Sequence, residues 1–251
     1  MPTISTKPYL SVVIPAYNEA DNFKSGVLKP VIDYLNAQKY TWEVLLVDDG
    51  STDETNELLT DFCLGHPEFK LRRIEHGGKA VAVTEGVLAA SGQLILFTDF
   101  DQSTPITEVN KFIDHHSQGA DLVISYRADR RDTLIAKVRG WLFATLVQVV
   151  ALPGILDSQC GFKSFTRKSA QKIFLSLIVS RPTKITGGYM GAFDVEVLFL
   201  ARKFGYRIDQ VPVKWVRYVS DRLNIWREPL MMAKDTFKVR LYDILGKYDV
   251  I

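Results

Sequence analysis

The feature that most constrains the fold is a repeated alternation of short apolar runs with longer amphipathic stretches. Strongly apolar runs of strand length occur at 10–15, 44–47, 94–97 and 121–125. Segments with helical spacing of apolar residues lie between them, as at 79–90. Strands that alternate with helices form βαβ units. We therefore predict an α/β fold with a Rossmann-like, mainly parallel sheet flanked by helices.

Weaker patterns extend this prediction through the rest of the chain. The additional elements expected are an edge-like strand at 69–74, strands at 161–166 and 208–213, and a helix at 194–203. Pro30 is expected to bend or split the helical region between Asn18 and Gln38. The second half is less regular than the first, and no internal repeat or flexible linker divides the chain.

Composition excludes several classes of protein. The 251 residues are 47% hydrophobic, enough for one large core and too apolar for a disordered chain. A formal charge of +2 gives no global field that would collect nucleic acid. Cys63 and Cys160 are far apart and lack a partner motif, so we expect neither a disulfide scaffold nor a zinc site. No signal peptide or membrane-spanning segment is expected.

One apolar segment, at 141–156, has two open interpretations. It is mostly apolar but is interrupted, among others, by Gln148 and Pro153. It is too short and too broken to span a bilayer, and a buried core helix would explain it. The alternative is a helix in the membrane interface, with Lys137 and Arg139 contacting headgroups.

Three loops expected at the carboxyl ends of strands are acidic. They have the sequences PAYNEA, DDGSTD and DFDQSTP. Their carboxylates include those of Glu19, Asp48, Asp49, Asp99 and Asp101. Open α/β sheets bind ligands at this edge, where carboxylates of like charge repel one another unless a cation is present. The pattern favours a site for a cation or a cationic ligand.

Among these carboxylates, Asp99 and Asp101 form the pair that most specifically indicates a cation site. When two carboxylates are separated by one residue at a strand end, one can bind a divalent cation. The other can accept hydrogen bonds from a ribose or from the water bound to the ion. Mg²⁺ and Mn²⁺ prefer such oxygen ligands, with diphosphate and water completing the coordination. The alternative is a capped turn, in which these carboxylates accept backbone amides ahead of Thr104 and Pro105.

Asp48 and Asp49 are open to a similar pair of interpretations. The turn signal that begins at Asp49 explains one carboxylate as a cap, but we do not expect it to explain both. A carboxylate that accepts from a base imide or a ribose would give nucleotide specificity. Pro15, Ala16 and Tyr17 would then line the wall beside the base, although Tyr17 alone is more typical of packing.

As a set, these motifs resemble the family 2 glycosyltransferases of the GT-A fold. The matching pieces, between Leu10 and Arg222, are VVIPAYNEA, LLVDDGSTDET, GGKAVAVTEGVLAASG, LILFTDFDQSTP, DSQCGFKSF and FDVEVLFLARKFG. Within that superfamily the chain is most similar to polyprenyl-phosphate sugar synthases. DSQCGFKSFTR together with DQSTP resembles the dolichyl-phosphate β-glucosyltransferases most.

The resemblance implies how the donor is held. The residues implied around the nucleotide sugar are Pro15, Ala16, Tyr17, Glu19, Asp48 or Asp49, Lys79 and Phe100. Asp99 and Asp101 would act on the diphosphate together with Mg²⁺ or Mn²⁺. Ala80 replaces the usual glycine after the lysine. Gln102 directly follows the second aspartate, whereas mannosyl relatives have a glutamine two places after it, so the third metal ligand stays open.

The resemblance also implies basic residues for the phosphates. Arg127, in the segment SYR, and Arg139 would bind the acceptor phosphate, since a guanidinium holds phosphate oxygens bidentately. Arg217 and Arg222 resemble a late basic pair that closes over the donor diphosphate. For each arginine, a solvated surface position is the alternative.

The acidic start of the segment FDVEVLF suggests a role on the acceptor side. Asp194 and Glu196 could orient the acceptor or contact a sugar hydroxyl, although helix-start electrostatics explains Asp194 equally well. Gly187 and Gly188 suggest a mobile acceptor loop. A phosphate monoester is already a charged nucleophile at neutral pH, so no strong general base is expected. We expect one in-line displacement with inversion.

The resemblance thus implies one domain, 1–251, with a nucleotide-sugar half at about 8–125 and an acceptor half at about 126–251. The expected reaction transfers a hexose, best glucose from UDP-glucose, to a polyprenyl or dolichyl phosphate at the cytoplasmic face of a membrane. The membrane would be the endoplasmic reticulum in a eukaryote or the plasma membrane in a prokaryote. Alternatives are a GDP-mannose donor, a soluble acceptor, or a non-catalytic nucleotide-sugar-binding module. The sequence predicts no oligomeric state.

Overall fold

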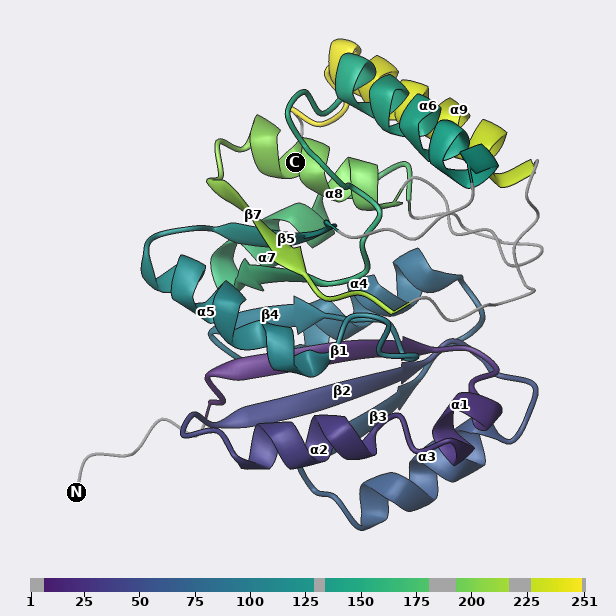
Figure 1. The fold of residues 1–251 in the computed structure, drawn as a ribbon, viewed down its shortest axis with the longest axis vertical. Helices are drawn as coiled ribbons and strands as arrows, with labels where there is room; N and C mark the ends of the chain where they lie inside the picture. The colour runs from purple at the N-terminus through teal and green to yellow at the C-terminus, as the bar shows by residue number, and fades with distance from the viewer. Residues whose placement is uncertain (1–6, 129–133, 181–192, 217–226, 250–251) are drawn as a thin grey trace.

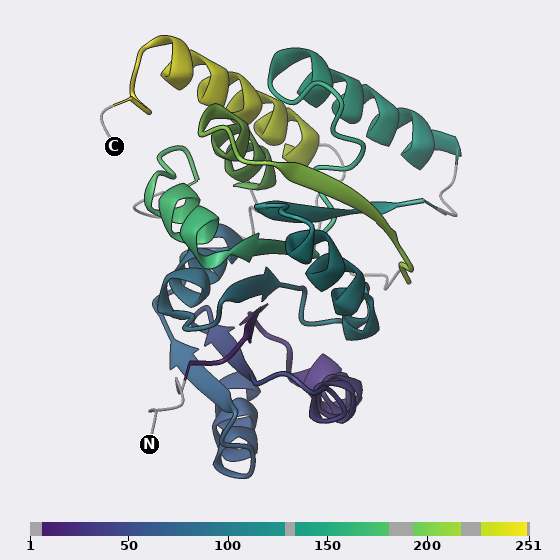
Figure 2. The same cartoon turned by 90° about the vertical axis from the view of Figure 1, so that its left-hand side faces the viewer.

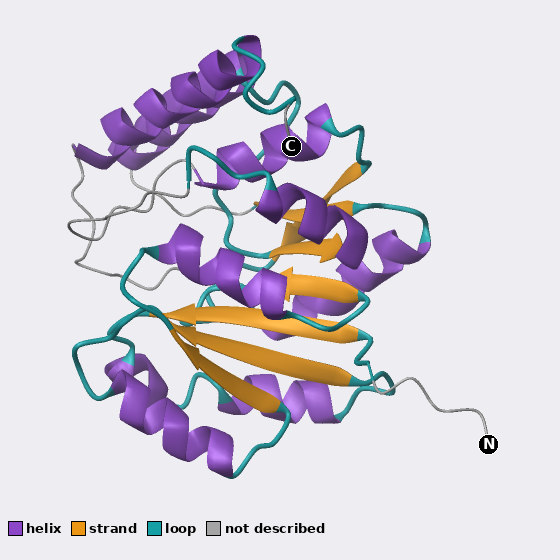
Figure 3. Ribbon diagram, turned by 180° about the vertical axis from the view of Figure 1, so that it is seen from behind, coloured by secondary structure: helices purple, strands orange, loops and turns teal. Residues whose placement is uncertain are grey.

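A computed structural model describes residues 7–128, 134–180, 193–216 and 227–249. Its centre is a seven-stranded sheet with the order β3-β2-β1-β4-β6-β5-β7. The strands are β1 (Leu10–Ala16), β2 (Trp42–Asp48), β3 (Phe69–Arg73), β4 (Leu94–Phe97), β5 (Leu122–Arg127), β6 (Lys163–Thr166) and β7 (Ile208–Val213). Helices cover both faces of this sheet (Figures 1 and 3). The predicted fold class is confirmed.

All neighbouring strands are parallel except where β6 is involved. β6 pairs antiparallel with β4 on one side and with β5 on the other, so Ser164 lies opposite both Leu96 and Val123. The predicted edge strand, β3, does lie at one edge of the sheet. Insertion of the reversed β6 between β4 and β5 brings the segment before it to the edge where β4 ends.

The helices differ in which sheet face they cover. They are α1 (Ala20–Lys24), α2 (Lys29–Asn36), α3 (Thr55–Leu64), α4 (Lys79–Ala89), α5 (Val109–Ser117), α6 (Leu134–Val150), α7 (Arg167–Leu175), α8 (Phe193–Lys203) and α9 (Arg227–Ile244), with a 3₁₀ turn at Ile106–Glu108. Apolar residues of α2, α3 and α5 join one core cluster, and those of α4, α7 and α8 join the other. Pro30 lies in the first turn of α2, which confirms the predicted split from α1.

The core lies on both sides of the sheet because side chains alternate along each strand. In β1, Val13 belongs to one buried cluster, whereas Val12 and Ile14 belong to the other. All three side chains are completely buried. A strand covered on both faces needs apolar residues at successive positions. This explains why β1 reads as a continuous apolar run.

The segment at 141–156 is divided between helix and loop. Helix α6 ends at Val150, and Val147, Leu152 and Ile155 are buried in the core, whereas Val149 is 79% exposed. Its C-terminal part is therefore core, as one of the two interpretations predicts. Among the described helices, none combines the length and the apolar character needed to cross a bilayer. Helices α6 and α9 lie side by side at one end of the molecule (Figures 1 and 2).

The strand order creates a switch point beside β1. The chain first moves from β1 outward to β2 and β3, and then returns to place β4 on the opposite side of β1. Loops that follow β1 and β4 therefore diverge at their carboxyl ends. Ligands of open α/β sheets bind in the crevice that such a divergence leaves.

Candidate active site

The loops that follow β1 and β2 are joined into one unit at this edge. The Asn18 amide donates to Ser51 Oγ (3.0 Å), and Asn18 Oδ1 accepts the Thr52 amide (2.8 Å). The Glu19 amide donates to Thr55 Oγ1 (2.7 Å). Asn18 adopts a positive φ of 52°, which asparagine tolerates better than most residues. These bonds fix the PAYNEA loop against the DDGSTD loop.

Asp48 is a structural residue of this unit. It is completely buried, with Oδ1 accepting the Ser51 amide (3.0 Å) and Oδ2 accepting Asn56 Nδ2 (2.9 Å). The carboxylate therefore holds the turn and the start of α3. The turn therefore explains only one of the two adjacent carboxylates, as expected, and the second one, Asp49, binds amides of a different loop.

Asp49 holds the loop that leads into α4. Its two oxygens accept the amides of Gly77 (2.8 Å) and Gly78 (2.9 Å), and His76 Nδ1 lies 2.9 Å from Oδ2. Burial raises the pKa of the Asp49 carboxyl, although these amides favour its charged form. The ring of His76 also stacks on Tyr17 with centroids 4.3 Å apart. Tyr17 therefore packs against protein, as its alternative interpretation predicts.

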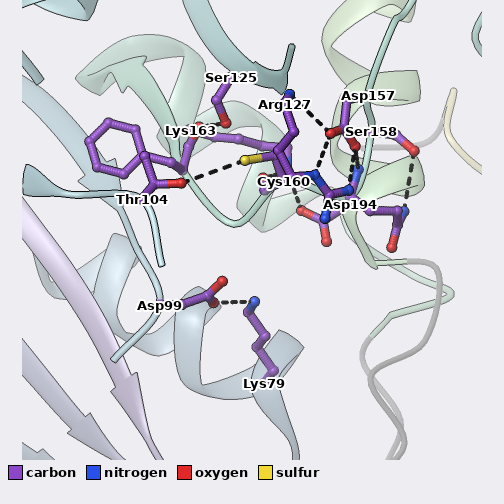
Figure 4. Close-up of polar contacts among 12 residues, drawn as sticks. Lys79, Asp99, Thr104, Ser125, Arg127, Asp157, Ser158, Cys160, Lys163 and Asp194 are labelled. Atoms are coloured by element: carbon purple, nitrogen blue, oxygen red, sulfur yellow. Dashed lines mark hydrogen bonds and ion pairs between the residues drawn. The ribbon is translucent and has the colours of Figure 1, made fainter. Parts of the chain in front are cut away.

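Lys79 and Asp99 meet at the carboxyl edge of the sheet. Lys79 is the first residue of α4, and Asp99 lies two residues after β4. Their side chains form an ion pair between Nζ and Oδ1 (Figure 4). Burial alone would lower the pKa of Lys79, but the charges of Asp99 and Asp194 outweigh it, so the pKa is raised. The start of α4 is thereby fixed to the D-x-D loop.

Asp101 carries a second negative charge in the same loop. Its Oδ1 accepts the Ser103 amide (2.9 Å), so part of the capped-turn interpretation is correct. Burial raises the pKa of Asp101, and the charge of Asp99 raises it further. Gln102 has a φ of 52° and donates from Nε2 to the Asp99 carbonyl (2.9 Å), while its Oε1 is buried without a hydrogen-bond partner.

The loops that contain Asp48, Asp49, Lys79, Asp99 and Asp101 fall within a region that matches a known family. The family model described as glycosyl transferase family 2 matches residues 11–174. The chain belongs to glycosyltransferase family 2. The enzyme class expected from the motifs is confirmed, and the Lys79–Asp99 pair lies inside the matched region.

Curated relatives of this glycosyltransferase share one name, dolichyl-phosphate beta-glucosyltransferase. The protein of that name from Dictyostelium discoideum is 33% identical, over 96% of this chain and 77% of its own length. The Saccharomyces cerevisiae protein is 32% identical, with coverages of 96% and 76%. For the Homo sapiens protein the identity is 31%, with coverages of 99% and 80%.

Solved structures share the fold of this glycosyltransferase. Glucosyl-3-phosphoglycerate synthase from Mycobacterium tuberculosis, crystallised with Mn²⁺, UDP and glucosyl-3-phosphoglycerate, superposes with a TM-score of 0.61 at 21% identity, covering 95% of this chain and 80% of that one. A mannosyltransferase from Pyrobaculum calidifontis, crystallised with GDP-mannose and Mn²⁺, gives 0.57 at 21% identity. The match covers 87% of this chain and 59% of the mannosyltransferase.

The D-x-D loop of the glycosyltransferase has the chemistry of a divalent-ion site. Within the described parts of the chain, no three His, Cys, Asp or Glu side chains gather in an arrangement that could hold a metal ion. Mg²⁺, however, is commonly held by one or two carboxylates plus substrate phosphates. Asp99 and Asp101 supply two such oxygen donors, and the unpartnered Oε1 of Gln102 is a third oxygen in the same loop. The donor set fits a hard divalent cation.

Asp194, in the first turn of α8, lies in a buried ion pair. Its Oδ1 accepts a hydrogen bond from Lys163 Nζ at 2.6 Å, and the same ammonium donates to the Cys160 carbonyl (2.6 Å; Figure 4). Lys163 is completely buried and lies 5.4 Å from the centroid of the Phe97 ring. Because Asp194 also acts electrostatically on Lys79, the start of α8 and the start of α4 share one charge network.

Arg127 is already engaged with a carboxylate. Its Nε and Nη2 donate to the two oxygens of Asp157 at 2.6 and 2.9 Å (Figure 4), and the guanidinium lies 5.2 Å from the Trp215 ring centroid. Both side chains of the ion pair are about nine-tenths buried, at 12% and 10% exposed. An acceptor phosphate at Arg127 would therefore have to compete with Asp157.

Glu196 serves the fold rather than a sugar. It is completely buried, and its carboxylate accepts the amides of Ile178, Val179 and Ser180 at 2.7–2.8 Å. The hydroxyl of Tyr248 donates to the same carboxylate at 2.7 Å. The expectation that Glu196 contacts a sugar hydroxyl is wrong, because its oxygens are occupied by these donors.

Other predicted site residues have mixed outcomes. The side chain of Phe100 is 3% exposed and that of Ala16 is 2% exposed, and both belong to the apolar core, so neither side chain lines a donor wall. Glu19 Oε2 accepts a hydrogen bond from Asn22, and Pro15 is half-buried. Four predicted residues, Arg217, Arg222, Gly187 and Gly188, lie outside the described residues, as does the side chain of Arg139 within α6.

Gly161 is a site residue that motif reasoning did not single out. A Cβ placed there would lie 2.6 Å from Cγ of Asp99, closer than side-chain carbons approach one another. The available signal was the glycine within DSQCGFKSF, which the matching motifs already contained. The sequence did not predict that Gly161 lies against Asp99, because this contact depends on the antiparallel direction of β6, which brings the preceding segment against the D-x-D loop.

Proposed function

We propose that this glycosyltransferase transfers glucose from UDP-glucose to a dolichyl or other polyprenyl phosphate, with Mg²⁺ or Mn²⁺ and with inversion at the sugar carbon. The observation that carries the proposal is the Asp99–Asp101 pair at the end of β4, held beside Lys79 at the switch point of the sheet. The names of relatives at 31–33% identity support the donor sugar and the lipid acceptor.

On the donor side, Asp99, Asp101 and Lys79 would face the diphosphate. A bound divalent cation supplies the positive charge that offsets the leaving UDP. Lys79 adds a fixed positive charge, because its raised pKa keeps it protonated at neutral pH. Asp48 and Asp49 would act on the nucleotide through the loops that they hold.

The donor pocket would be completed by residues from two further segments. Pro15 lies at the end of β1, and Tyr17 and Glu19 lie in the loop after it; we propose that all three lie beside the nucleotide. Arg217 and Arg222 are proposed to contact the diphosphate from the segment after β7. These five roles rest on the motif resemblance.

On the acceptor side, one phosphate oxygen would attack C1 of glucose while the bond between C1 and the departing UDP oxygen breaks. The phosphate monoester already carries negative charge at neutral pH, so positioning matters more than proton removal. Asp194 would help by fixing Lys163 and the loop before β6. Arg139 would bind the acceptor phosphate, and Arg127 would join it by exchanging Asp157 for phosphate.

The acceptor also implies where the enzyme works. A polyprenyl chain stays in the bilayer, so we propose peripheral association with the cytoplasmic side of a membrane, with 137–156 near the interface. In this arrangement the nucleotide-sugar half, at about 8–125, holds the donor, while the half at about 126–251 receives the acceptor within a single domain.

A donor panel tests the proposal directly. Purified enzyme with Mg²⁺ or Mn²⁺ is given radiolabelled UDP-glucose or GDP-mannose and one polyprenyl phosphate in detergent. Label in the lipid fraction with UDP-glucose alone is the expected result. Transfer from GDP-mannose alone would show that the donor is GDP-mannose. Transfer only to a soluble glycan would reject the lipid acceptor. The absence of any transfer would favour a non-catalytic nucleotide-sugar-binding module.

A further inference from the structure

The chain that leaves β7 passes from the end of β5 to the D-x-D loop. Val213, the last residue of β7, lies opposite Arg127 in the parallel pairing of β5 and β7. Three residues later, the Val216 amide donates to the Ser103 carbonyl at 2.8 Å. In the sheet, β7 is separated from β4 by two other strands. Residues 214–216, which we call the bridge segment, therefore connect the end of β5 with the loop that follows β4.

Trp215, in the middle of the bridge segment, contacts Arg127. The guanidinium lies over the half-buried indole, with Cζ 5.2 Å from the ring centroid. Nε and Nη2 of the same guanidinium donate to Asp157 (Figure 4). An aromatic ring attracts a cation through the charge distribution of its face and accepts no strong hydrogen bond from it. The contact with Trp215 therefore restricts the orientation of Arg127 without competing for the donors that bind Asp157.

Ser103 joins the bridge segment to the donor side. Its amide donates to Asp101 Oδ1 at 2.9 Å, while its carbonyl accepts the Val216 amide. Ser103 is buried, and a buried backbone group that loses its partner costs free energy. The position of Val216 is therefore tied to that of the D-x-D loop. Trp215 is held close to this tether, although its ring contacts Arg127.

We propose that Trp215 is a positioning residue for the acceptor. Its ring orients the Arg127 guanidinium, and the bond between Val216 and Ser103 sets where that ring lies relative to Asp101. The inference rests on the proposed function, in which Arg127 takes the acceptor phosphate and Asp101 acts on the donor diphosphate. A one-step displacement requires the attacking phosphate and the leaving diphosphate to be aligned across C1 of the sugar. Trp215 contributes to this alignment, because one short segment contacts groups on both sides.

Substitutions of the ring test this role. Trp215→Leu keeps an apolar side chain but removes the ring face, and it should lower kcat/KM for a short-chain polyprenyl phosphate in detergent roughly tenfold. Trp215→Phe keeps a ring face and should stay within about threefold of the parent. The KM for UDP-glucose should be unchanged in both variants, because the backbone bond to Ser103 remains.

Trp42→Leu is the matched control. Trp42 is also half-buried, but it lies at the start of β2, at the opposite end of the strands, where its ring packs against Phe69 with centroids 5.9 Å apart. Transfer kinetics in Trp42→Leu should equal those of the parent. A similar loss of kcat/KM in Trp42→Leu and Trp215→Leu would show a general effect of losing a tryptophan and would overturn the inference.

A double-mutant cycle with Arg127→Lys shows whether the ring acts through Arg127. Lysine keeps a positive charge beside Asp157 but has no planar group to orient. The effect of Trp215→Leu should therefore fall from roughly tenfold to about twofold or less in the Arg127→Lys background. An equal effect in both backgrounds, or parent kinetics in Trp215→Leu, would overturn the inference.

Calorimetric titration of the same polyprenyl phosphate, without donor or metal, separates this inference from the proposed function. The affinity should fall roughly threefold or more in Trp215→Leu. If the affinity falls but the parent transfers no sugar, only the proposed function is rejected, whereas a parent that binds no polyprenyl phosphate overturns both. Thermal unfolding establishes that each variant is folded, and Trp215→Met, whose longer side chain fills more space, replaces Trp215→Leu if the latter does not fold.

Discussion

The backbone at Gly161 lies so close to Asp99 that an added Cβ would stand 2.6 Å from the Asp99 carboxyl carbon. Lys79 pairs with the same carboxylate. Asp99 is thus fixed between the start of α4 and the segment before β6, two parts of the chain more than 70 residues apart. The first acid of the D-x-D pair is positioned by the fold and does not depend on its own loop alone.

Gly161→Ala tests this positioning. The added methyl group should displace the Asp99 carboxylate, and a displacement of about 1 Å at a reacting site lowers turnover by roughly 100-fold. The circular dichroism spectrum should stay unchanged. Steady-state transfer kinetics measure the effect, with Gly65→Ala as the control, because a Cβ there meets only the Phe62 carbonyl at 3.7 Å. Equal activity in both variants would show that Asp99 needs no such restraint.

Asp101→Asn should separate stability from activity. The raised pKa of Asp101 means that the folded chain holds this proton more tightly than the unfolded chain. The stability that it gives is present below the ordinary carboxyl pKa and is lost as the pH rises through the raised value. At neutral pH the buried charge is therefore unfavourable.

The amide of Asp101→Asn still accepts the Ser103 amide but carries no charge. We expect a higher Tm at pH 7, a difference that shrinks toward pH 4, and transfer reduced by roughly 100-fold or more. Differential scanning calorimetry at several pH values, together with the transfer assay, measures both effects. A lower Tm at neutral pH would contradict the electrostatic account.

Asp49→Asn distinguishes a loop-holding residue from a nucleotide ligand. The new amide nitrogen would face an N–H donor from Gly77 or Gly78, leaving a buried donor unsatisfied. The free energy of unfolding should fall by about 1–3 kcal/mol even without nucleotide. Urea unfolding measures this change. If stability is unchanged while UDP affinity falls, Asp49 acts on the nucleotide directly.

Glu196→Gln should destabilise the fold through the segment at 178–180. A glutamine presents only one carbonyl oxygen to donors that now share two carboxylate oxygens. We expect a loss of about 1–3 kcal/mol in the free energy of unfolding, measured by urea denaturation. Tyr248→Phe removes one donor and should cost less, about 1 kcal/mol. A fully stable Glu196→Gln would show that the carboxylate charge is not required.

The sequence predicted strands best where burial on both faces leaves a continuous apolar run. β1, β2 and β4 were expected within a few residues of their observed bounds, and the acidic loops were placed at the correct edge. The direction of β6 was not predictable, because an antiparallel strand between two parallel ones depends on tertiary pairing. Helix α9 was not expected, since its buried Val239 and its exposed Leu230, Phe237 and Leu241 place apolar residues on two sides of the helix and obscure the helical period.

Side-chain roles within the loops were harder to predict than the loops themselves. The sequence identifies Asp48 and Asp49 as acidic but says nothing of Asn56 or of the Gly77 and Gly78 amides that bind them. Phe100 lies between two site carboxylates, yet its side chain turns into the core. Such assignments depend on contacts between segments that are distant in the chain.

The most direct measurement is calorimetric titration of UDP with and without Mn²⁺. The central claim is that Asp99 and Asp101 bind the donor diphosphate through a divalent cation. Mn²⁺ should tighten UDP binding to the parent protein by roughly tenfold or more, and Asp101→Asn should lose that enhancement while keeping its fold. If UDP binds the parent equally well without metal, and Asp101→Asn changes nothing, the claim is contradicted.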